Sequence, residues 1–164
     1  MSTLSDEKET PPRVVIIGVG NLLMKDEGIG IHVIQALQEM ELPEDVSLVD
    51  GGTSPELWAY TRVGDKLIII DAAKAGGAKG AVYRFKPEDI TAERGFLNSA
   101  HELGVIEALN LMTFAGNKPG DVVIIGIEPA EIAPGLELSD VLRQKMPDII
   151  KVVLKEIQTP PENP

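Results

Sequence analysis

Three side chains that can bind a divalent metal ion stand next to expected element boundaries. Glu27 follows the apolar run RVVII and its glycine turn, Asp71 closes the run LIIID, and His101 lies in the segment NSAHELG. In open α/β sheets ligands bind outside the carboxyl ends of the strands, so Glu27 and Asp71 would share a crevice if the first and third strands are neighbours. One imidazole and two carboxylates suit zinc or nickel better than a soft ion.

Each of these residues also has a purely structural explanation. Asp26 and Glu27 in the first turn of a helix would offset its dipole, each by ~0.3–1 kcal/mol. Asp71 can cap a turn. His101 can be an exposed residue of a first helical turn, where the positive helix end favours the neutral imidazole that metals bind. His32 borders the apolar stripe of the expected first helix and is interpreted as a boundary residue. Because the chain has no HExxH motif, a metal site depends on convergence in space.

The stretch GVGNLLMKDEGIG has a second interpretation as a dinucleotide-binding loop. Gly18 and Gly20 match the first two glycines of the G-x-G-x-x-G pattern, and Asp50 ends the second run, where a ribose-binding acid would sit. However, Leu23 occupies the third glycine position, and the acids that follow would repel a pyrophosphate. No Lys-Ser/Thr pair follows the glycines, which excludes a P-loop.

The elements that must position these residues follow from the hydrophobic pattern. Apolar runs at residues 13–19, 46–50, 66–71, 80–85 and 121–127 alternate with segments of helical period. Thr53 and Glu56 have capping-box spacing, which predicts a short helix over residues 54–61, and Ser99 is expected to cap a later helix. The pattern predicts an α/β fold: a three-layer sandwich with a twisted, mostly parallel (mixed) five-stranded sheet between helices. The fourth run follows a short glycine-rich link, so it is expected near an edge and antiparallel.

Composition excludes several classes of function. The chain has 164 residues, a formal net charge of −11 and no cysteine, which argues against nucleic-acid or membrane partners and removes thiolate chemistry. No Gly-x-Ser-x-Gly elbow occurs, and Ser54 and Ser99 are more naturally helix caps than nucleophiles. We expect flexible tails at residues 1–12 and 158–164, a single α/β domain over residues 13–157, and a cytoplasmic location.

The motifs GVGNLLMKDEGIG, VDGGT, LIIIDAA and SAHELG, in this order and spacing, resemble those of the maturation endopeptidases of nickel–iron hydrogenases. The resemblance runs from about Arg13 to Ile157. It implies a three-layer α/β fold, a peptidase domain over residues 13–157 and an aspartyl-type endopeptidase activity. The substrate implied is the precursor of the hydrogenase large subunit, which loses a short C-terminal extension after nickel insertion.

The resemblance also implies roles for particular residues. Glu27, Asp71 and His101 would be the metal-binding and catalytic residues, while Gly51, Gly52 and Thr53 would contact the substrate backbone. The metal would be nickel carried by the precursor, and zinc or cadmium could replace it in the isolated protein. A monomer is expected. The residues leave two alternatives open: a nucleotide-binding enzyme of doubly wound fold, and a non-enzymatic nickel-binding chaperone.

Overall fold

The computed structural model describes residues 13–53, 56–89 and 100–160, without the side chains of residues 58 and 100–103. Its centre is a five-stranded sheet in the order β2-β1-β3-β5-β4. The strands are β1 (Val14–Val19), β2 (Val46–Gly52), β3 (Lys66–Ala72), β4 (Val82–Phe85) and β5 (Asp121–Ile127). β1 is parallel to both β2 and β3, and β5 is parallel to β3, whereas β4 is antiparallel to β5. The condition that the first and third strands are neighbours is met, and the expected antiparallel edge strand is confirmed.

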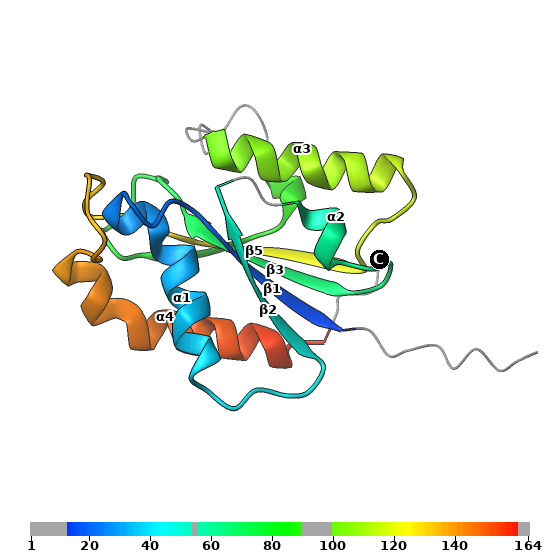
Figure 1. Ribbon diagram of the computed structural model, residues 1–164, viewed down its shortest axis with the longest axis horizontal. Coiled ribbons are helices and arrows are strands. Elements are labelled where there is room, and N and C mark those ends of the chain that lie inside the picture. The colour runs from blue at the N-terminus through cyan, green and yellow to red at the C-terminus, as the bar shows by residue number, and fades with distance from the viewer. Residues whose placement is uncertain (1–12, 54–55, 90–99, 161–164) are drawn as a thin grey trace, which may run out of the picture.

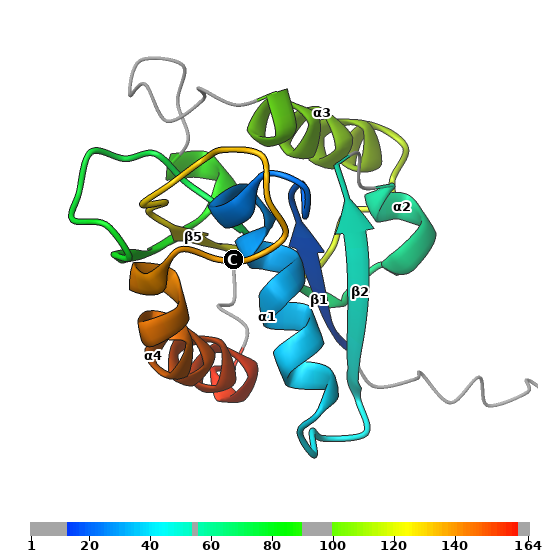
Figure 2. The same ribbon diagram turned by 60° about the vertical axis from the view of Figure 1, so that its left-hand side comes forward.

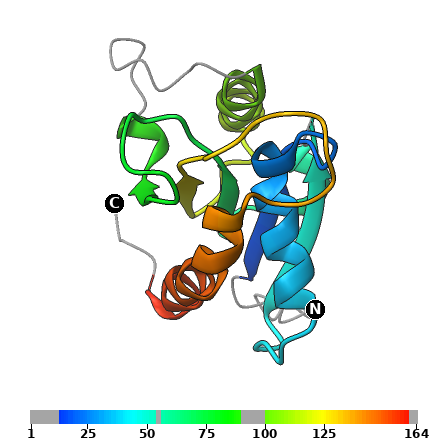
Figure 3. The ribbon, with the colours of Figure 1, turned by 90° about the vertical axis from the view of Figure 1, so that its left-hand side faces the viewer.

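Helices cover both faces of this sheet. On one face lie α1 (Ile29–Gln38) and α4 (Asp140–Gln158), and on the other lie α2 (Leu57–Tyr60) and α3 (Ala100–Phe114) (Figures 1 and 2). Two short 3-10 helices, η1 (Lys25–Gly28) and η2 (Pro87–Asp89), complete the described elements. The end-on view in Figure 3 separates the three layers. The predicted three-layer sandwich is confirmed, and no helix among the described residues is long and apolar enough to cross a membrane.

Alternation along the central strands divides the apolar core into two clusters. Ile16, Ile68 and Ile70 belong to the cluster beneath α1 and α4, whereas Ile17 and Ile69 belong to the cluster beneath α2 and α3. All five side chains are fully buried. Successive residues of a strand point to opposite faces, so a strand covered on both sides reads as a continuous apolar run. That is why the runs at β1, β3 and β5 were recognisable in the sequence.

Two helix starts differ from the sequence-based expectation. The first helix was expected to begin near Asp26, but η1 precedes it and α1 begins at Ile29. The second was expected over residues 54–61, but α2 begins at Leu57, and Glu56 makes no side-chain capping bond. β2 continues through Gly52, whose φ of +58° turns the chain just before Thr53. Ser54 and Ser99, predicted as caps, lie outside the described residues.

Close contact between α1 and the sheet depends on Gly18 and Gly30. A Cβ atom on Gly30 would collide with the carbonyl oxygens of Ile70 and Val19, and one on Gly18 would collide with the carbonyl oxygen of Gly30. The helix therefore rests directly on the backbone of β1 and β3. This contact fixes where α1 begins, and hence where the preceding η1 lies.

A buried ionic network holds the opposite end of β3. Lys66 is 4% exposed, and its Nζ donates to Oε1 of Glu156 at 2.9 Å. Arg84 of β4 donates to the same carboxylate through Nε at 2.8 Å, and Lys86 forms an ion pair with Asp121 at 2.6 Å. The network ties the last turns of α4 to β3, β4 and β5, and so anchors the beginning of β3, the strand that carries Asp71.

The Glu156 network predicts a pH-dependent stability. Burial raises the pKa of Glu156, but hydrogen bonds from Arg84 and Lys66 outweigh it, so the pKa lies below its ordinary value of 4.5. A carboxylate with a lowered folded pKa stabilises the fold above its unfolded pKa and loses this effect as the pH falls through the folded pKa. We expect the difference in unfolding free energy between wild type and Glu156→Gln, measured by urea denaturation, to shrink from about pH 6 to about pH 3. A constant difference would contradict this.

The Gly30 contact predicts opposite effects of the same substitution in two helices. Gly30→Ala should lower the unfolding free energy by about 2–3 kcal/mol because backbone must move. Gly104→Ala in α3 should raise it by about 0.5–1 kcal/mol, because a Cβ there meets nothing within 4 Å and alanine favours the helix. Chemical denaturation of the two variants measures both; a Gly30→Ala variant as stable as wild type would refute the close contact.

Candidate functional site

Glu27 is carried by η1, which the turn after β1 delivers to the carboxyl end of the sheet. Gly20 has a φ of +146°, and a Cβ there would collide with the carbonyl oxygen of Glu27. The N–H of Asn21 donates to that same oxygen at 3.2 Å, so η1 folds back onto the turn. η1 also packs against β3, and the Glu27 side chain is half-buried. The first predicted ligand thus lies on an element that contacts β3.

Asp71 is the residue before the last in β3, and it lies at the same end of the sheet. It is 5% exposed, and its Oδ1 accepts a hydrogen bond from the N–H of Ala72 at 2.8 Å. Leu67 and Ile69 belong to the core beneath α3, and alternation along the strand puts Asp71 on that same face. A buried carboxylate on the α3 side of β3 is therefore present where the sequence predicted it.

His101 is the second residue of α3, and its side chain lies outside the described part of the structure. In Figure 1 the beginning of α3 lies at the same end of the sheet as η1 and the end of β2. The described side chains by themselves form no group of three metal ligands. The backbone thus brings the three elements to one end, while the convergence of Glu27, Asp71 and His101 stays a prediction.

The predicted substrate-binding turn, Gly51, Gly52 and Thr53, adjoins the turn that carries Glu27. The N–H of Gly20 donates to the carbonyl oxygen of Gly52 at 2.9 Å. The N–H of Gly52 donates to Oδ1 of Asp50 at 3.0 Å, and a Cβ on Gly52 would meet nothing within 4 Å. Thr53 is exposed. The end of β2 is therefore fixed to the candidate site and has open space above it. Its contact with substrate stays a prediction.

Asp26 has a role that its sequence position did not indicate. Its carboxylate is fully buried and accepts four hydrogen bonds: from the N–H groups of Ala130, Glu131 and Ser139 at 2.9, 2.8 and 2.8 Å, and from the Ser139 hydroxyl at 2.7 Å. The interpretation of Asp26 as an acid in the first turn of the helix does not hold, because α1 begins only at Ile29. The charge of Asp26 is used to hold the segment before α4.

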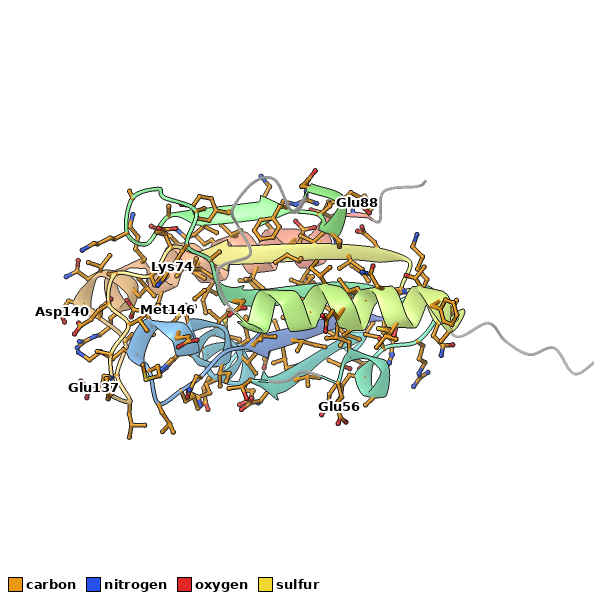
Figure 4. The ribbon with its side chains drawn as sticks, turned by 90° about the horizontal axis from the view of Figure 1, so that it is seen from above. Glu56, Lys74, Glu88, Glu137, Asp140 and Met146 are labelled. Carbon is orange, nitrogen blue, oxygen red and sulfur yellow. The ribbon has the colours of Figure 1, made fainter. Side chains whose placement is uncertain are left out.

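Ser139 completes this connection. It is the N-cap of α4, and its Oγ accepts from the N–H of Leu142 at 3.3 Å while donating to Asp26. Backbone bonds reinforce the join, since Gly135 donates to the carbonyl oxygen of Leu23 at 2.8 Å and Lys25 donates to that of Gly135 at 3.0 Å. Figure 4 shows Glu137 and Asp140 on this segment, at the end of the sheet that holds η1. Two chain segments therefore form one unit beside Glu27.

The nucleotide interpretation loses its supporting residues. Gly18 is needed for contact with α1, Gly20 for contact with η1, and Asp50 binds the N–H of Gly52 within its own turn. η1 stands before α1, where a pyrophosphate would approach. His32 is half-buried in α1; burial lowers the pKa of its imidazole, which agrees with a boundary residue.

Comparison with known proteins decides the family. The sequence model described as hydrogenase maturation protease matches residues 31–156. The chain belongs to the hydrogenase maturation protease family. The hydrogenase 2 maturation protease of Escherichia coli is 30% identical over 149 residues, covering 89% of this chain and 91% of that protein. A hydrogenase expression/formation protein of Azotobacter vinelandii is 32% identical, covering 89% of this chain and 72% of the other.

Solved structures agree with this assignment. The hydrogenase maturating endopeptidase HybD of E. coli superposes with a TM-score of 0.80 at 30% identity and covers 89% of this chain and 92% of its own. A hydrogenase maturation protease of Thermococcus kodakarensis, at 23% identity and a TM-score of 0.70, shares the fold. This maturation protease is therefore a hydrolase of the α/β class, as its motifs predicted.

Adjacent acids of this maturation protease should respond differently to substitution. Asp26→Ala should lower the unfolding free energy by about 3 kcal/mol, because it leaves four donors without their acceptor. Glu27→Gln, at the next and half-buried position, should change it by no more than about 0.5 kcal/mol. Urea denaturation measures both values. Equal losses would contradict the division between a structural Asp26 and a functional Glu27.

Proposed function

We propose that this protease removes the C-terminal extension of a nickel–iron hydrogenase large-subunit precursor, after nickel has been inserted, and that the nickel in the precursor is the feature it recognises. Glu27, Asp71 and His101 contact that nickel. Membership of the family supports proteolysis in hydrogenase maturation. The placement of Glu27 and Asp71 supports the choice of residues.

The observation that carries the proposal is the buried carboxylate of Asp71 beside η1. Asp71 is 5% exposed, and its Oδ1 accepts a hydrogen bond from the N–H of Ala72 at the carboxyl end of β3. Glu27 is carried by an element that packs on the same strand. Two carboxylates and an imidazole are a donor set suited to a borderline divalent ion such as nickel. A metal held by the substrate brings the positive charge that such a pair of acids favours.

This arrangement explains how an unloaded precursor would be rejected. Without nickel, docking would remove water from the carboxylates of Glu27 and Asp71 without supplying a cation, and desolvation of a charged group is costly. With nickel present, the same oxygens gain a ligand bond. Discrimination then rests on a difference of affinities between loaded and unloaded precursor, which is the physical basis of specificity. The bound extension lies beside the metal, and the Gly51–Thr53 turn contacts its backbone.

Incubation of the protease with nickel-loaded and nickel-free precursor tests the proposal. Mass spectrometry should show loss of the C-terminal extension from the loaded precursor and an unchanged mass for the unloaded one. Equal cleavage of both would refute nickel recognition. Binding without a change in mass would instead support a non-enzymatic nickel carrier, and a thermal shift with NAD, NADP or flavin would support the nucleotide-binding alternative.

Variants of the three residues give a sharper prediction. Glu27→Gln, Asp71→Asn and His101→Ala should each lower kcat/KM for the loaded precursor by about 10²-fold or more, as loss of a group that acts at the reacting centre does. Glu137→Gln is the matched control, because Glu137 is an exposed acid at the same end of the sheet (Figure 4). Normal cleavage by His101→Ala would remove His101 from the site.

A further inference from the structure

Among the residues that the structure describes, no strand pairs with the outer edge of β2, and this edge ends beside the proposed site. β2 is the last strand on its side of the sheet. In Figure 1 it crosses in front of the other strands, and in Figure 3 it runs along the right-hand margin. An open edge presents main-chain N–H and C=O groups to which an extended segment can pair. The segment Val46–Gly52 contains no proline or lysine, the residues that commonly block such an edge.

The hydrogen bonds with β1 identify which residues face outward. The N–H of Val14 donates to the carbonyl oxygen of Asp45 at 2.9 Å, and β1 and β2 are parallel. In a parallel ladder the residues whose main-chain groups face the partner alternate along the strand. Ser47 and Val49 therefore face β1, and the residues between and after them face away from it.

Leu48 and Asp50 are these outward residues. Within the described ranges, no hydrogen bond reaches the main-chain N–H or C=O group of either. Val46 also faces outward, but its N–H donates to the carbonyl oxygen of Pro43 at 3.1 Å, which closes that end of the edge. The edge thus offers two complete pairs of donor and acceptor, and these lie toward the end nearest the site.

The chain segment that contains β2 carries charged residues of one sign only. From Asp26 to Thr61 the chain carries eight aspartate and glutamate residues and no lysine or arginine. Glu44 and Asp45 precede the strand, Asp50 lies in it, and all three are exposed. Glu56, beyond its end, is also exposed and lies on the β2 side of the molecule in Figure 4. Such a strip attracts a basic segment and repels an acidic one.

We propose that the outer edge of β2 binds the C-terminal extension of the precursor as an added antiparallel strand, and that lysine or arginine side chains in the extension pair with the acidic strip. This inference rests on the proposed function. The extension begins at the scissile bond and therefore runs away from the site, whereas β2 runs toward it. The two directions are opposite, which gives antiparallel pairing.

Continuity with the site selects the extension over other segments. Gly52, at the end of β2, is bonded to the turn that carries Glu27. The stretch from Asp50 back to Val46 accommodates about five residues at about 3.4 Å each. A free chain end can lie along this edge, while the folded body of the precursor stays beyond the end of the sheet. Main-chain pairing supplies affinity with little dependence on side chains, and the charges favour basic extensions.

Binding of a short peptide tests the pairing without any cleavage. The probe is a blocked peptide of alternating lysine and valine, and the control is its glutamate and valine counterpart. Hydrogen exchange measured by NMR should slow at the amides of Leu48 and Asp50 on adding the lysine peptide, whereas Ser47 and Val49 should change little because β1 already protects them. Alternate amides of the peptide would face β2. N-methylation of the amides that face β2 should abolish binding, whereas N-methylation of the amides that face away should not. Protection elsewhere, or none, would overturn the proposal.

Charge reversal tests the acidic strip in the cleavage reaction. Glu44→Lys combined with Asp45→Lys should raise KM for the loaded precursor by about fivefold with kcat unchanged. Reversing the charges of the extension should restore KM. Asp148→Lys is the matched control, because Asp148 is exposed on α4, which packs on the sheet next to α1. An unchanged KM in the double variant would overturn the role of the strip.

The two assays separate failure of this inference from failure of the proposed function. If wild type cleaves loaded precursor but the double variant and the peptide assay show no effect, the β2 edge is wrong and the proposed function stands. If wild type cleaves no precursor while the lysine peptide still protects Leu48 and Asp50, the proposed function is wrong and the edge is a binding site for a basic strand.

Discussion

The hydrogen bonds accepted by the buried carboxylate of Asp26 hold together the end of the molecule where the strands β1, β2 and β3 finish. A charge with no exposure must have its hydrogen-bond capacity filled, and four donors from residues 130–139 fill it. Those donors come from a segment that has no regular secondary structure of its own before α4. The carboxylate therefore imposes a shape on that segment and, at the same time, fixes η1. Glu27 is the next residue, so the hydrogen bonds of Asp26 also determine where Glu27 lies.

The glycines supply the second constraint. Gly18 and Gly30 bring α1 onto the backbone of β1 and β3, and Gly20 brings η1 onto the turn. These contacts use backbone, so they leave little freedom for η1 to shift along the sheet. The glycine-rich turn resembles a phosphate loop because both need close approach of main chain. Here the approaching backbone belongs to the protein itself.

Much of the fold followed from periodicity, and the failures were local. The parallel strands were recognisable because residues such as Ile68 and Ile69 are buried on opposite faces. The predicted start of α2 was wrong because Glu56 makes no side-chain capping bond, which the spacing of Thr53 and Glu56 does not reveal. Glu27 and Asp71 were predicted because acids that follow apolar strands lie at the carboxyl end of a sheet. The hydrogen-bond partners of Asp26 were not predicted, because they lie 104 to 113 residues away in the chain.

The acidic strip along β2 also has a consequence for encounters between two copies of this chain. An exposed edge strand with two open donor and acceptor pairs is a template for edge-to-edge association. Two copies meeting through β2 would bring Asp45 and Asp50 of one against the like charges of the other. The repulsion would oppose pairing of the edges at the concentrations where a crowded cell would otherwise favour it. One set of charges can thus keep the edge vacant until a chain of opposite sign arrives.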